Sequence, residues 1–289
     1  MKISFRTTAE EHYMPALHSR QHLMRSLMLS LLLIMTIVCL SFALDTAYLT
    51  PDYSIKSLPP SFAHPFGTDW LGRDMLTRTV KGLRFSMVIG LLGSAIGVAV
   101  AVLFGIFAAA GGKKADAVIL WLIDMFIGMP HLVFLILISF AVGRGAKGII
   151  IGVALTHWPS LARLVRNEVK AVQNLEYIKL SETFGKSRLF IVKNHILPVI
   201  LPQIMVGFLL LFPHAILHEA SMTFLGFGLS AEKPSAGIIL SEAVKHISLG
   251  HWWLAVFPGA LLAILVKSFD SIGESLRVLI EPQGVNDET

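Results

Sequence analysis

Residues 85–112 read FSMVIGLLGSAIGVAVAVLFGIFAAAGG and contain no Asp, Glu, Lys or Arg. As an α-helix this stretch would be roughly 42 Å long, at about 1.5 Å per residue. It would therefore exceed the roughly 30 Å hydrocarbon core of a bilayer. A soluble domain rarely carries such a run, because about a quarter of its residues are charged. The stretch predicts a transmembrane helix.

The rest of the chain has the same character. Of its 289 residues, 54% are hydrophobic and only 15% are charged, and the mean hydropathy is +0.70. Further apolar runs predict five more spans, so we expect an all-α polytopic membrane protein with six transmembrane helices. The additional runs are residues 26–44, 117–143, 148–162, 194–217 and 251–266.

The distribution of basic residues predicts the orientation of the chain. The first apolar run resembles a signal peptide, but its long leader and the later spans favour an uncleaved anchor. Most Lys and Arg residues lie in the termini and in the loops that six spans would place beside them, which puts both termini in the cytoplasm. Cys39 has no second cysteine with which to form a disulfide, and a net charge of +5 gives no reason to expect nucleic-acid binding.

Polar residues within the apolar runs are candidate functional positions. Asp124 lies inside run 117–143, and we interpret it as a structural residue that faces protein or water. A proton relay would need further carboxylates, and only Glu219 and Asp270 lie near other spans. Proline beside His131 and His157 predicts helix irregularities, which are tolerated where protein or a cavity covers the freed backbone.

A histidine pair near the end of run 194–217 suggests a substrate path. His214 and His218 share one helix face at i and i+4, a spacing that can hold a metal, and Met222 follows at the same interval. With Glu219 the order is H-x-x-x-H-E, which differs from the H-E-x-x-H of zinc proteases. Hydrogen-bonded interior groups are the alternative. We assign no permanent metal site, no cofactor and no catalytic residue.

Small residues recur every four positions in run 85–112. They lie on one helix face and allow another backbone to approach closely. Static packing is the favoured interpretation, and a sliding or pore-lining surface is the alternative. This small-residue stripe consists of Gly93, Gly97, Ala101, Gly105 and Ala109.

The stretch SETFGKSRLF (181–190) contains Gly185-Lys186-Ser187, which match the last three residues of a phosphate-binding loop. Leu180, however, stands where the first Gly of that motif belongs. We therefore reject a nucleotide site. Tyr177, Leu180 and Phe184 instead predict an apolar stripe on a short helix that Gly185 ends, with Ser187 capping the next helix. Such a helix suits a groove on another protein. Lying on lipid headgroups is the alternative.

Several stretches resemble a known family. Gly185 and the later ILP at 196–198 resemble the EAA loop of ABC importer permeases. Four further stretches resemble the C-type permease of the dipeptide/oligopeptide/nickel importer family, and the resemblance covers about residues 64–282. They are HPFGTDWLGRD (64–74), LIDMFIGMP (122–130), HEASMTFLGFGL (218–229) and WWLAVFPGALLAILVKSFDSIGESLRVLIEP (252–282).

The resemblance implies a type I ABC importer architecture in a bacterial cell membrane. The expected partners are a homologous second permease, two cytoplasmic ABC ATPases, an extracytoplasmic solute-binding protein and membrane lipid. The short helix becomes a coupling helix that transmits ATPase closure to the spans, so the chain itself is not an enzyme. The expected coupling residues are Tyr177, Lys179, Leu180, Ser181, Phe184 and Gly185.

The same resemblance divides the chain into expected segments. They are a cytoplasmic N-terminal segment (1–25), a first transmembrane helix (26–45), an extracytoplasmic loop with GTDWLGRD (46–84), a permease core (85–282) containing a cytoplasmic coupling loop (163–194), and a C-terminal tail (283–289).

The sequence departs from the family at Lys179-Leu180-Ser181, where Glu-Ala-Ala is usual, so a charge contact with the ATPase is altered. The candidate substrate path consists of His214, His218, Glu219 and Met222. Its His and Met side chains favour a metal ion (nickel, cobalt or zinc) or an opine-type metal–chelator complex as substrate. Di- or oligopeptides are the alternative. A proton-coupled secondary transporter and a membrane metalloenzyme remain as other classes.

Overall fold

The computed structural model of the chain describes residues 9–230 and 234–280. Its regular structure is helical throughout that part, apart from one isolated bridge between Thr68 and Asp74. The elements are α1 (Ala9–Ala43), η1 (Thr46–Leu49), η2 (Tyr53–Ile55), α2 (Met75–Ala110), α3 (Lys113–Ile127), α4 (His131–Val142), α5 (Ala146–Gln173), α6 (Glu176–Thr183), α7 (Arg188–Ile191), the π-helical turn η3 (Val192–Ile196), α8 (Leu197–Phe224), α9 (Ala236–Ile247) and α10 (Trp253–Ile280).

The all-α architecture predicted from the hydropathy is confirmed. Five helical stretches of the described chain are long and apolar enough to cross a membrane, and α3 with α4 makes a sixth span if this bent pair counts as one. The five stretches are Leu23–Ala43, Met75–Ala110, Ala146–Gln173, Arg188–Phe224 and Trp253–Ile280.

The helix irregularity that Pro130 predicts within run 117–143 is a sharp bend. The chain bends by 100° between α3 and α4. Gly128 ends α3, and Pro130 immediately precedes α4 without a backbone N–H to continue the hydrogen-bond ladder. The run is apolar enough for a span, but its Gly-Met-Pro sequence breaks it into two short helices.

Several helices extend beyond the apolar runs that predicted them. α2 begins at Met75, because Asp74 accepts a hydrogen bond from the Thr77 backbone N–H at 2.8 Å and caps the helix. Its first turns thus belong to the segment that we expected to be the loop 46–84. α5 likewise continues to Gln173, inside the expected coupling loop 163–194.

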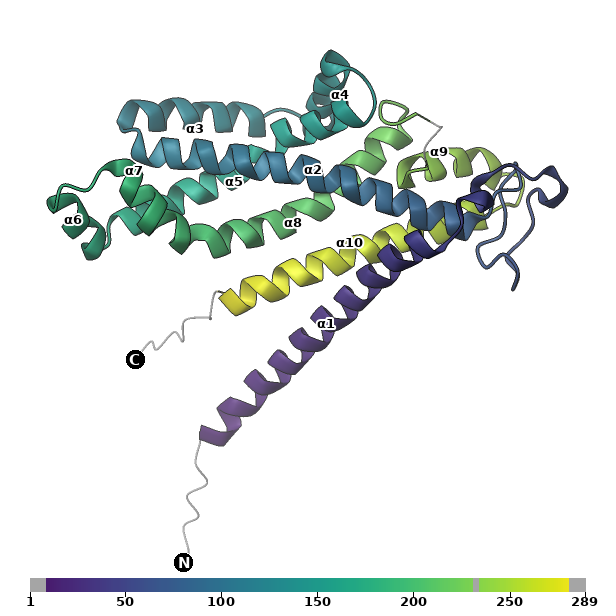
Figure 1. Cartoon of the computed structure of the whole chain (residues 1–289), viewed down its shortest axis with the longest axis horizontal. Coiled ribbons are helices and arrows are strands. Elements are labelled where there is room, and N and C mark those ends of the chain that lie inside the picture. The colour runs from purple at the N-terminus through teal and green to yellow at the C-terminus, as the bar shows by residue number, and fades with distance from the viewer. Residues whose placement is uncertain (1–8, 231–233, 281–289) are drawn as a thin grey trace, which may run out of the picture.

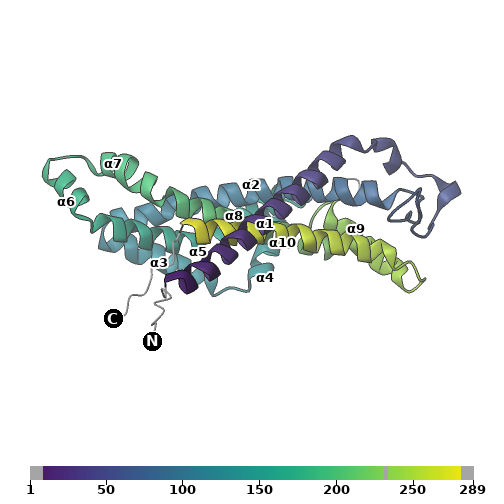
Figure 2. The ribbon, with the colours of Figure 1, turned by 90° about the horizontal axis from the view of Figure 1, so that it is seen from below.

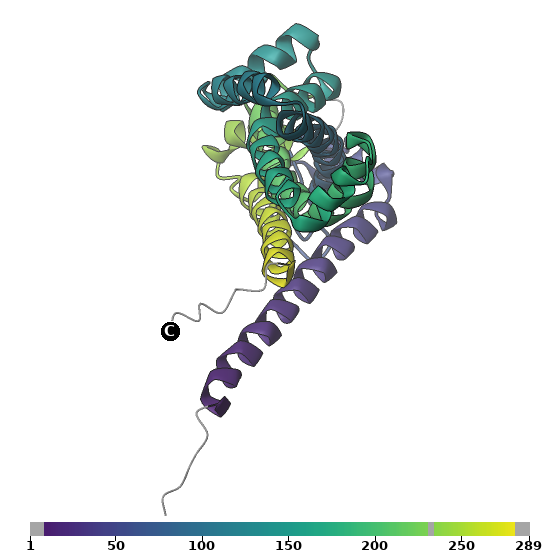
Figure 3. The same ribbon diagram turned by 90° about the vertical axis from the view of Figure 1, so that its left-hand side faces the viewer.

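The long helices run side by side along the molecule (Figure 1). α2, α5 and α8 form the centre, α3 packs along α2 and α5, and α10 packs against α8. α1 contacts α10 and α2 and then diverges from the bundle, as the end view in Figure 3 shows.

The two ends of the bundle carry different structures. Figure 2 shows α6 and α7 at one end, and α9 with the loop before α2 at the other. The first turns of α1 and the last turn of α10 lie toward the α6 end. This arrangement agrees with a topology in which both termini and the α5–α8 connection share one side of the membrane.

The small-residue stripe of α2 packs against α5. A Cβ atom added at Gly97 would lie 3.3 Å from the Ala154 carbonyl oxygen, and one at Gly105 would lie 2.8 Å from the Ala162 carbonyl oxygen. The two backbones approach closely because no side chain separates them. This contact supports the static-packing interpretation.

Candidate functional site

α6 is a short helix outside the bundle with one buried side chain. Ile178 is fully buried and joins the hydrophobic cluster that contains Val169 of α5 and Ile191 of α7. Tyr177, Leu180 and Phe184 point elsewhere and are 45%, 57% and 74% exposed. The structure therefore anchors α6 through a residue that we did not single out and leaves the expected apolar stripe accessible. We call these three exposed side chains the α6 stripe.

The turn after α6 has the geometry expected from its sequence. Gly185 has a φ angle of +75°, which favours glycine, and donates its N–H to the Glu182 carbonyl oxygen at 2.9 Å. The Lys186 N–H reaches the Ser181 carbonyl oxygen at 3.2 Å, which completes a Schellman motif. The Ser187 hydroxyl accepts a hydrogen bond from the Phe190 N–H and caps α7. Both predicted caps are confirmed.

The remaining coupling candidates lie around the same turn. Ser181 is within 3.3 Å of the Nε2 atom of His195, which comes from the π-helical turn η3, and the Tyr177 ring also contacts that imidazole. Lys179 is exposed. α6 is thus supported by η3 as well as by α5, and the Lys179 side chain is exposed to a partner.

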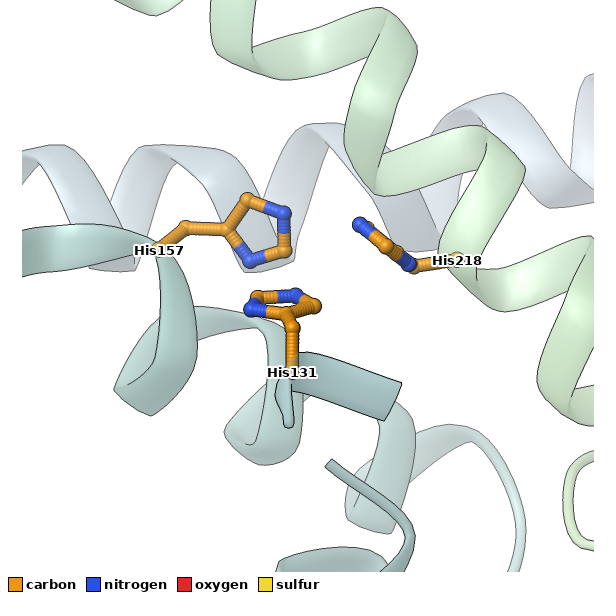
Figure 4. Close-up of side chains that lie close together, drawn as sticks. All are labelled: His131, His157 and His218. Atoms are coloured by element: carbon orange, nitrogen blue, oxygen red, sulfur yellow. The ribbon is translucent and has the colours of Figure 1, made fainter. Parts of the chain in front are cut away.

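A second candidate site lies where α4, α5 and α8 meet. His131 begins α4 directly after the bend, His157 lies in the first half of α5, and His218 lies near the end of α8. Figure 4 shows the three imidazole rings pointing toward one another. Each offers one nitrogen, and these atoms all lie within 4.8 Å of one another. We call these residues the histidine cluster.

A cavity of about 440 Å³ opens beside the cluster. Leucine side chains of α5 and α8 form much of its wall. Its polar lining comes from α4, α5 and α8 and consists of His131, Thr156, His157, Ser160 and His214. His214 also borders a second cavity, between α1, α8 and α10, whose lining includes Lys267 and Asp270. Polar groups inside an apolar bundle are costly, so such a lining is typical of a functional path.

Only two of the four substrate-path candidates on α8 reach the histidine cluster or the cavity. His218 belongs to the histidine cluster and His214 lines the adjoining cavity. Glu219 is fully buried, accepts a hydrogen bond from the Thr223 hydroxyl at 3.0 Å and lies near the hydroxyls of Ser86 and Ser235. The structure thus does not bring Glu219 to the cavity.

Met222 also lies away from the cavity. It is fully buried in a hydrophobic cluster with Ile89 of α2, Leu135 of α4 and Ile149 of α5. The structure therefore does not combine its sulfur with the two histidines.

In the sequence, His131 and His157 are marked only as neighbours of helix-disturbing prolines. That signal marks the correct places, because Pro130 directly precedes α4 and Pro159 lies inside α5. It does not show that the two side chains meet. Their contact depends on the bend between α3 and α4, which brings the start of α4 toward α5 and α8.

Acidic residues of α3 pair with basic residues of α5. Asp124 forms an ion pair with Arg163, which agrees with the structural interpretation of this carboxylate. Asp116 pairs with Arg166 and, at 2.5 Å, with Lys170.

Residues 64–74 form a third polar region at the end opposite α6, and we call them the 64–74 loop. The buried carboxylate of Asp69 accepts hydrogen bonds from Arg73 Nε at 2.6 Å and from Arg78 Nη1 at 3.0 Å. Arg78 also pairs with Glu242 of α9. The Trp253 indole of α10 donates to the Thr68 carbonyl oxygen at 3.3 Å. The loop therefore ties α2, α9 and α10 together.

The fold and these sites together define a class of protein. Apolar spans line an open cavity that carries polar side chains, and a short helix outside the bundle presents apolar side chains. This combination defines a multi-pass membrane transport subunit. Comparisons with known proteins then identify the family.

Residues 101–281 match the family model described as the binding-protein-dependent transport system inner membrane component. The dipeptide transport system permease protein DppC of Bacillus subtilis (strain 168) is 34% identical over 228 residues, covering 79% of this chain and 71% of that protein. The oligopeptide transport system permease protein OppC of the same bacterium is 31% identical over 257 residues, covering 87% and 84%. The chain belongs to this family of permeases.

Other relatives and structures agree. The probable D,D-dipeptide transport system permease protein DdpC of Escherichia coli (strain K12) is 33% identical over 234 residues, covering 80% of this chain and 78% of that protein. A chain from an inward-facing structure of the MetNI methionine ABC transporter has a TM-score of 0.52 at 21% identity, covering 72% of this chain and 96% of that chain. The structural likeness shows the shared fold.

The family membership establishes the general role. The chain is a multi-pass inner-membrane permease subunit of an ABC importer, and it is not an enzyme, because ATP hydrolysis belongs to a separate partner subunit. Importers of this kind generally combine a second permease, ATPase subunits and a solute-binding protein. The relatives named for peptide transport support the peptide alternative, whereas the expectation of a metal or metal–chelator substrate receives no support from them.

Proposed function

We propose that this permease imports short peptides and forms one half of the translocation pathway. The observation that carries the substrate class is the similarity, over about four fifths of the chain, to permeases named for dipeptide and oligopeptide transport. The cavity beside α5 and α8 has Ser, Thr and His side chains beside leucine side chains. Such a lining suits a peptide, which carries both backbone polar groups and apolar side chains.

The α6 stripe supports the proposed coupling to an ATPase. Tyr177, Leu180 and Phe184 present apolar surface that a cleft on a partner would bury. Gly185 and the cap at Ser187 fix the direction in which the chain leaves the helix. Lys179 and Ser181 lie on the same short helix and are proposed contacts with the ATPase surface.

Movement of α6 can be transmitted to the cavity through packed helices. Only Asn174 and Leu175 separate α5 from α6, and α7 with η3 continues directly into α8. Ile178 packs into the hydrophobic cluster shared by these elements. An ATPase that pulls or rotates α6 would therefore displace α5 and α8, whose side chains line the cavity. The contribution of this chain is positional.

The proposed assembly contains this permease, a homologous second permease, two cytoplasmic ATPases and an extracytoplasmic solute-binding protein, in the lipid of a bacterial cell membrane. The basic residues of segment 163–194 support a cytoplasmic location for the α6 end and for both termini. The 64–74 loop would then face the solute-binding protein.

The test is ATP hydrolysis by the assembled importer in lipid vesicles. Solute-binding protein loaded with defined di- and oligopeptides is expected to stimulate hydrolysis, and co-purification of two ATPase subunits is expected. Free Ni²⁺ and a Ni²⁺–chelator complex are the matched comparisons. Stimulation by these nickel forms without stimulation by any peptide would overturn the peptide assignment.

A further inference from the structure

We propose that His131, His157 and His218 form a binding site for a first-row divalent transition-metal ion such as Zn²⁺ or Ni²⁺. The site would be reached from the cavity that His214 lines. This inference goes beyond peptide import and does not depend on it, because it concerns an ion site within the permease itself.

The donor chemistry selects the class of ion. Three neutral imidazoles suit zinc, copper, iron and nickel, whereas magnesium and calcium prefer oxygen ligands. Three histidine ligands also leave one coordination position open for water or for a group on a passing molecule. The adjoining cavity lies on the side where such a group would approach.

The geometry needs only side-chain adjustment. A tetrahedral zinc ion with Zn–N bonds of 2.0–2.1 Å holds its ligand nitrogens roughly 3.3 Å apart. The three nitrogens already lie within 4.8 Å of one another, and the ring centroids are 4.4 to 4.9 Å apart. Rotation of the side-chain torsions that shifts the ring nitrogens by roughly 1–2 Å would bring them to that spacing.

His157 is already held in a ligand-like orientation. Its Nδ1 atom lies 3.0 Å from the Val153 carbonyl oxygen. The Thr156 hydroxyl lies 3.1 Å from the same nitrogen. A proton on Nδ1 can be donated to either oxygen, and in that tautomer the lone pair of Nε2 is free. Donation of the other ring N–H to a backbone carbonyl is the usual support for a metal-bound histidine.

His131 supplies an independent observation. Its Nε2 atom is buried and has no hydrogen-bond partner among the described residues. Burying such an atom without a partner is unfavourable. A metal ion between the three rings would satisfy it. The same contact would also join the bend between α3 and α4 to the two helices that line the cavity.

The experiment measures metal binding to the assembled importer in detergent, carrying an affinity tag without histidine. After treatment with a chelator, the protein is titrated with Zn²⁺ and with Ni²⁺ alone. One tightly bound ion per copy of this chain is expected. His131→Ala, His157→Ala and His218→Ala should each weaken binding at least about 10-fold, and the triple variant should lose that ion.

His251→Ala is the matched control. This histidine lies beside Trp253 at the end opposite α6, away from the cluster, and its removal should leave the affinity unchanged. Equal metal binding by the wild type and the triple variant would overturn the site, as would the absence of tight binding by the wild type.

X-ray absorption of the loaded wild-type importer tests the site without any variant, so it holds even if the variants fail to assemble. About three imidazole ligands are expected around the ion, and a first shell of oxygen ligands alone would contradict the proposal. Vesicle uptake then separates two sources of the ion. ATP-driven accumulation that needs the three histidines identifies a cargo ion, and retention of one ion without accumulation identifies a resident one.

Discussion

The two ends of the helical bundle are built in opposite ways. At the 64–74 loop, charged groups are buried and satisfy one another: Asp69 binds Arg73 and Arg78, and Arg78 also binds Glu242. The Trp70 ring stacks on His246 of α9, with 4.4 Å between centroids. This end uses its polar and aromatic side chains to fix three helices relative to one another.

The α6 end leaves the three apolar side chains of the α6 stripe exposed. Phe184 is 74% exposed, whereas Ile178 is the buried apolar side chain of this helix. One end of the bundle is therefore rigid, and the other end exposes apolar surface that suits a partner protein. Substitutions at the 64–74 loop should affect the stability of the isolated chain, whereas substitutions in the α6 stripe should affect communication with the ATPase.

Arg78→Ala is expected to have the largest effect. It removes one of the two guanidinium groups that pair with Asp69 and Glu242 and leaves only Arg73 beside them. Breaking a buried ion pair costs about 3–5 kcal/mol. The midpoint of thermal unfolding in detergent should fall sharply, together with the yield of protein in a monodisperse peak. The control is Arg277→Ala, which removes an exposed pair with Glu274 at 3.9 Å and should cost about 0–1 kcal/mol. Equal unfolding midpoints for the two variants would mean that the 64–74 loop is not the rigid end.

Ile178→Ala should have the next largest effect. Removing a fully buried side chain of this size costs about 2–5 kcal/mol, because a cavity remains. Leu180→Ala, two residues away, removes a side chain that is 57% exposed and should leave the unfolding midpoint nearly unchanged. If both variants unfold at the same temperature, α6 is not anchored through Ile178.

Two glycines at opposite ends test the same contrast through the backbone. Gly72 and Gly185 have φ angles of +80° and +75°, which side chains rarely adopt. A Cβ at Gly72 would lie 1.7 Å from the Asp52 carbonyl oxygen, whereas one at Gly185 would meet nothing within 4 Å. Gly72→Ala should therefore add a clash to the strain and cost about 2–4 kcal/mol. Gly185→Ala should cost only about 1–2 kcal/mol.

Both variants can be compared by thermal unfolding of the same purified importer. Gly185→Ala should lower the unfolding midpoint less than Gly72→Ala, because the added Cβ meets no neighbouring atom. A lower midpoint for Gly185→Ala than for Gly72→Ala would reverse the assignment of the rigid end.

The difference between the ends also explains what the sequence could predict. The caps at Gly185 and Ser187 and the apolar spacing of the α6 stripe depend on neighbouring residues, so reading the sequence found them. The spans followed from hydropathy in the same way. Pro130 marked the place of the bend between α3 and α4, but its 100° angle could not be predicted, because an apolar run records affinity for lipid and not the path of the backbone.

The candidate substrate site shows where sequence reasoning stops. Spacing along α8 identified His214 and His218, but it also selected Glu219 and Met222, which face Ser86 and Ile89 of α2 in the interior. His131 and His157 reach His218 only through the packing of α4, α5 and α8. No local pattern records such a contact, since the three residues lie far apart in the chain.

Phe184→Ala should have the smallest effect on stability and a clear effect on function. The side chain packs against little of this chain, so the free energy of unfolding should change by less than about 0.5 kcal/mol. Loss of an apolar anchor from a docking helix should weaken contact with the ATPase. ATP hydrolysis by the reconstituted importer should then lose its dependence on loaded solute-binding protein, and uptake should fall.

Lys179→Glu provides the sharper version of that test, because it changes charge without changing apolar surface. Lys179 is exposed on α6, so the substitution should leave the fold intact. If the ATPase surface is adapted to a positive charge here, reversal introduces repulsion and uncouples hydrolysis from uptake. Lys56→Glu, an exposed lysine before the 64–74 loop, is the charge-matched control and should not alter coupling. Uptake by the Lys179 variant equal to that of this control would show that the outward face of α6 does not meet the ATPase through this charge.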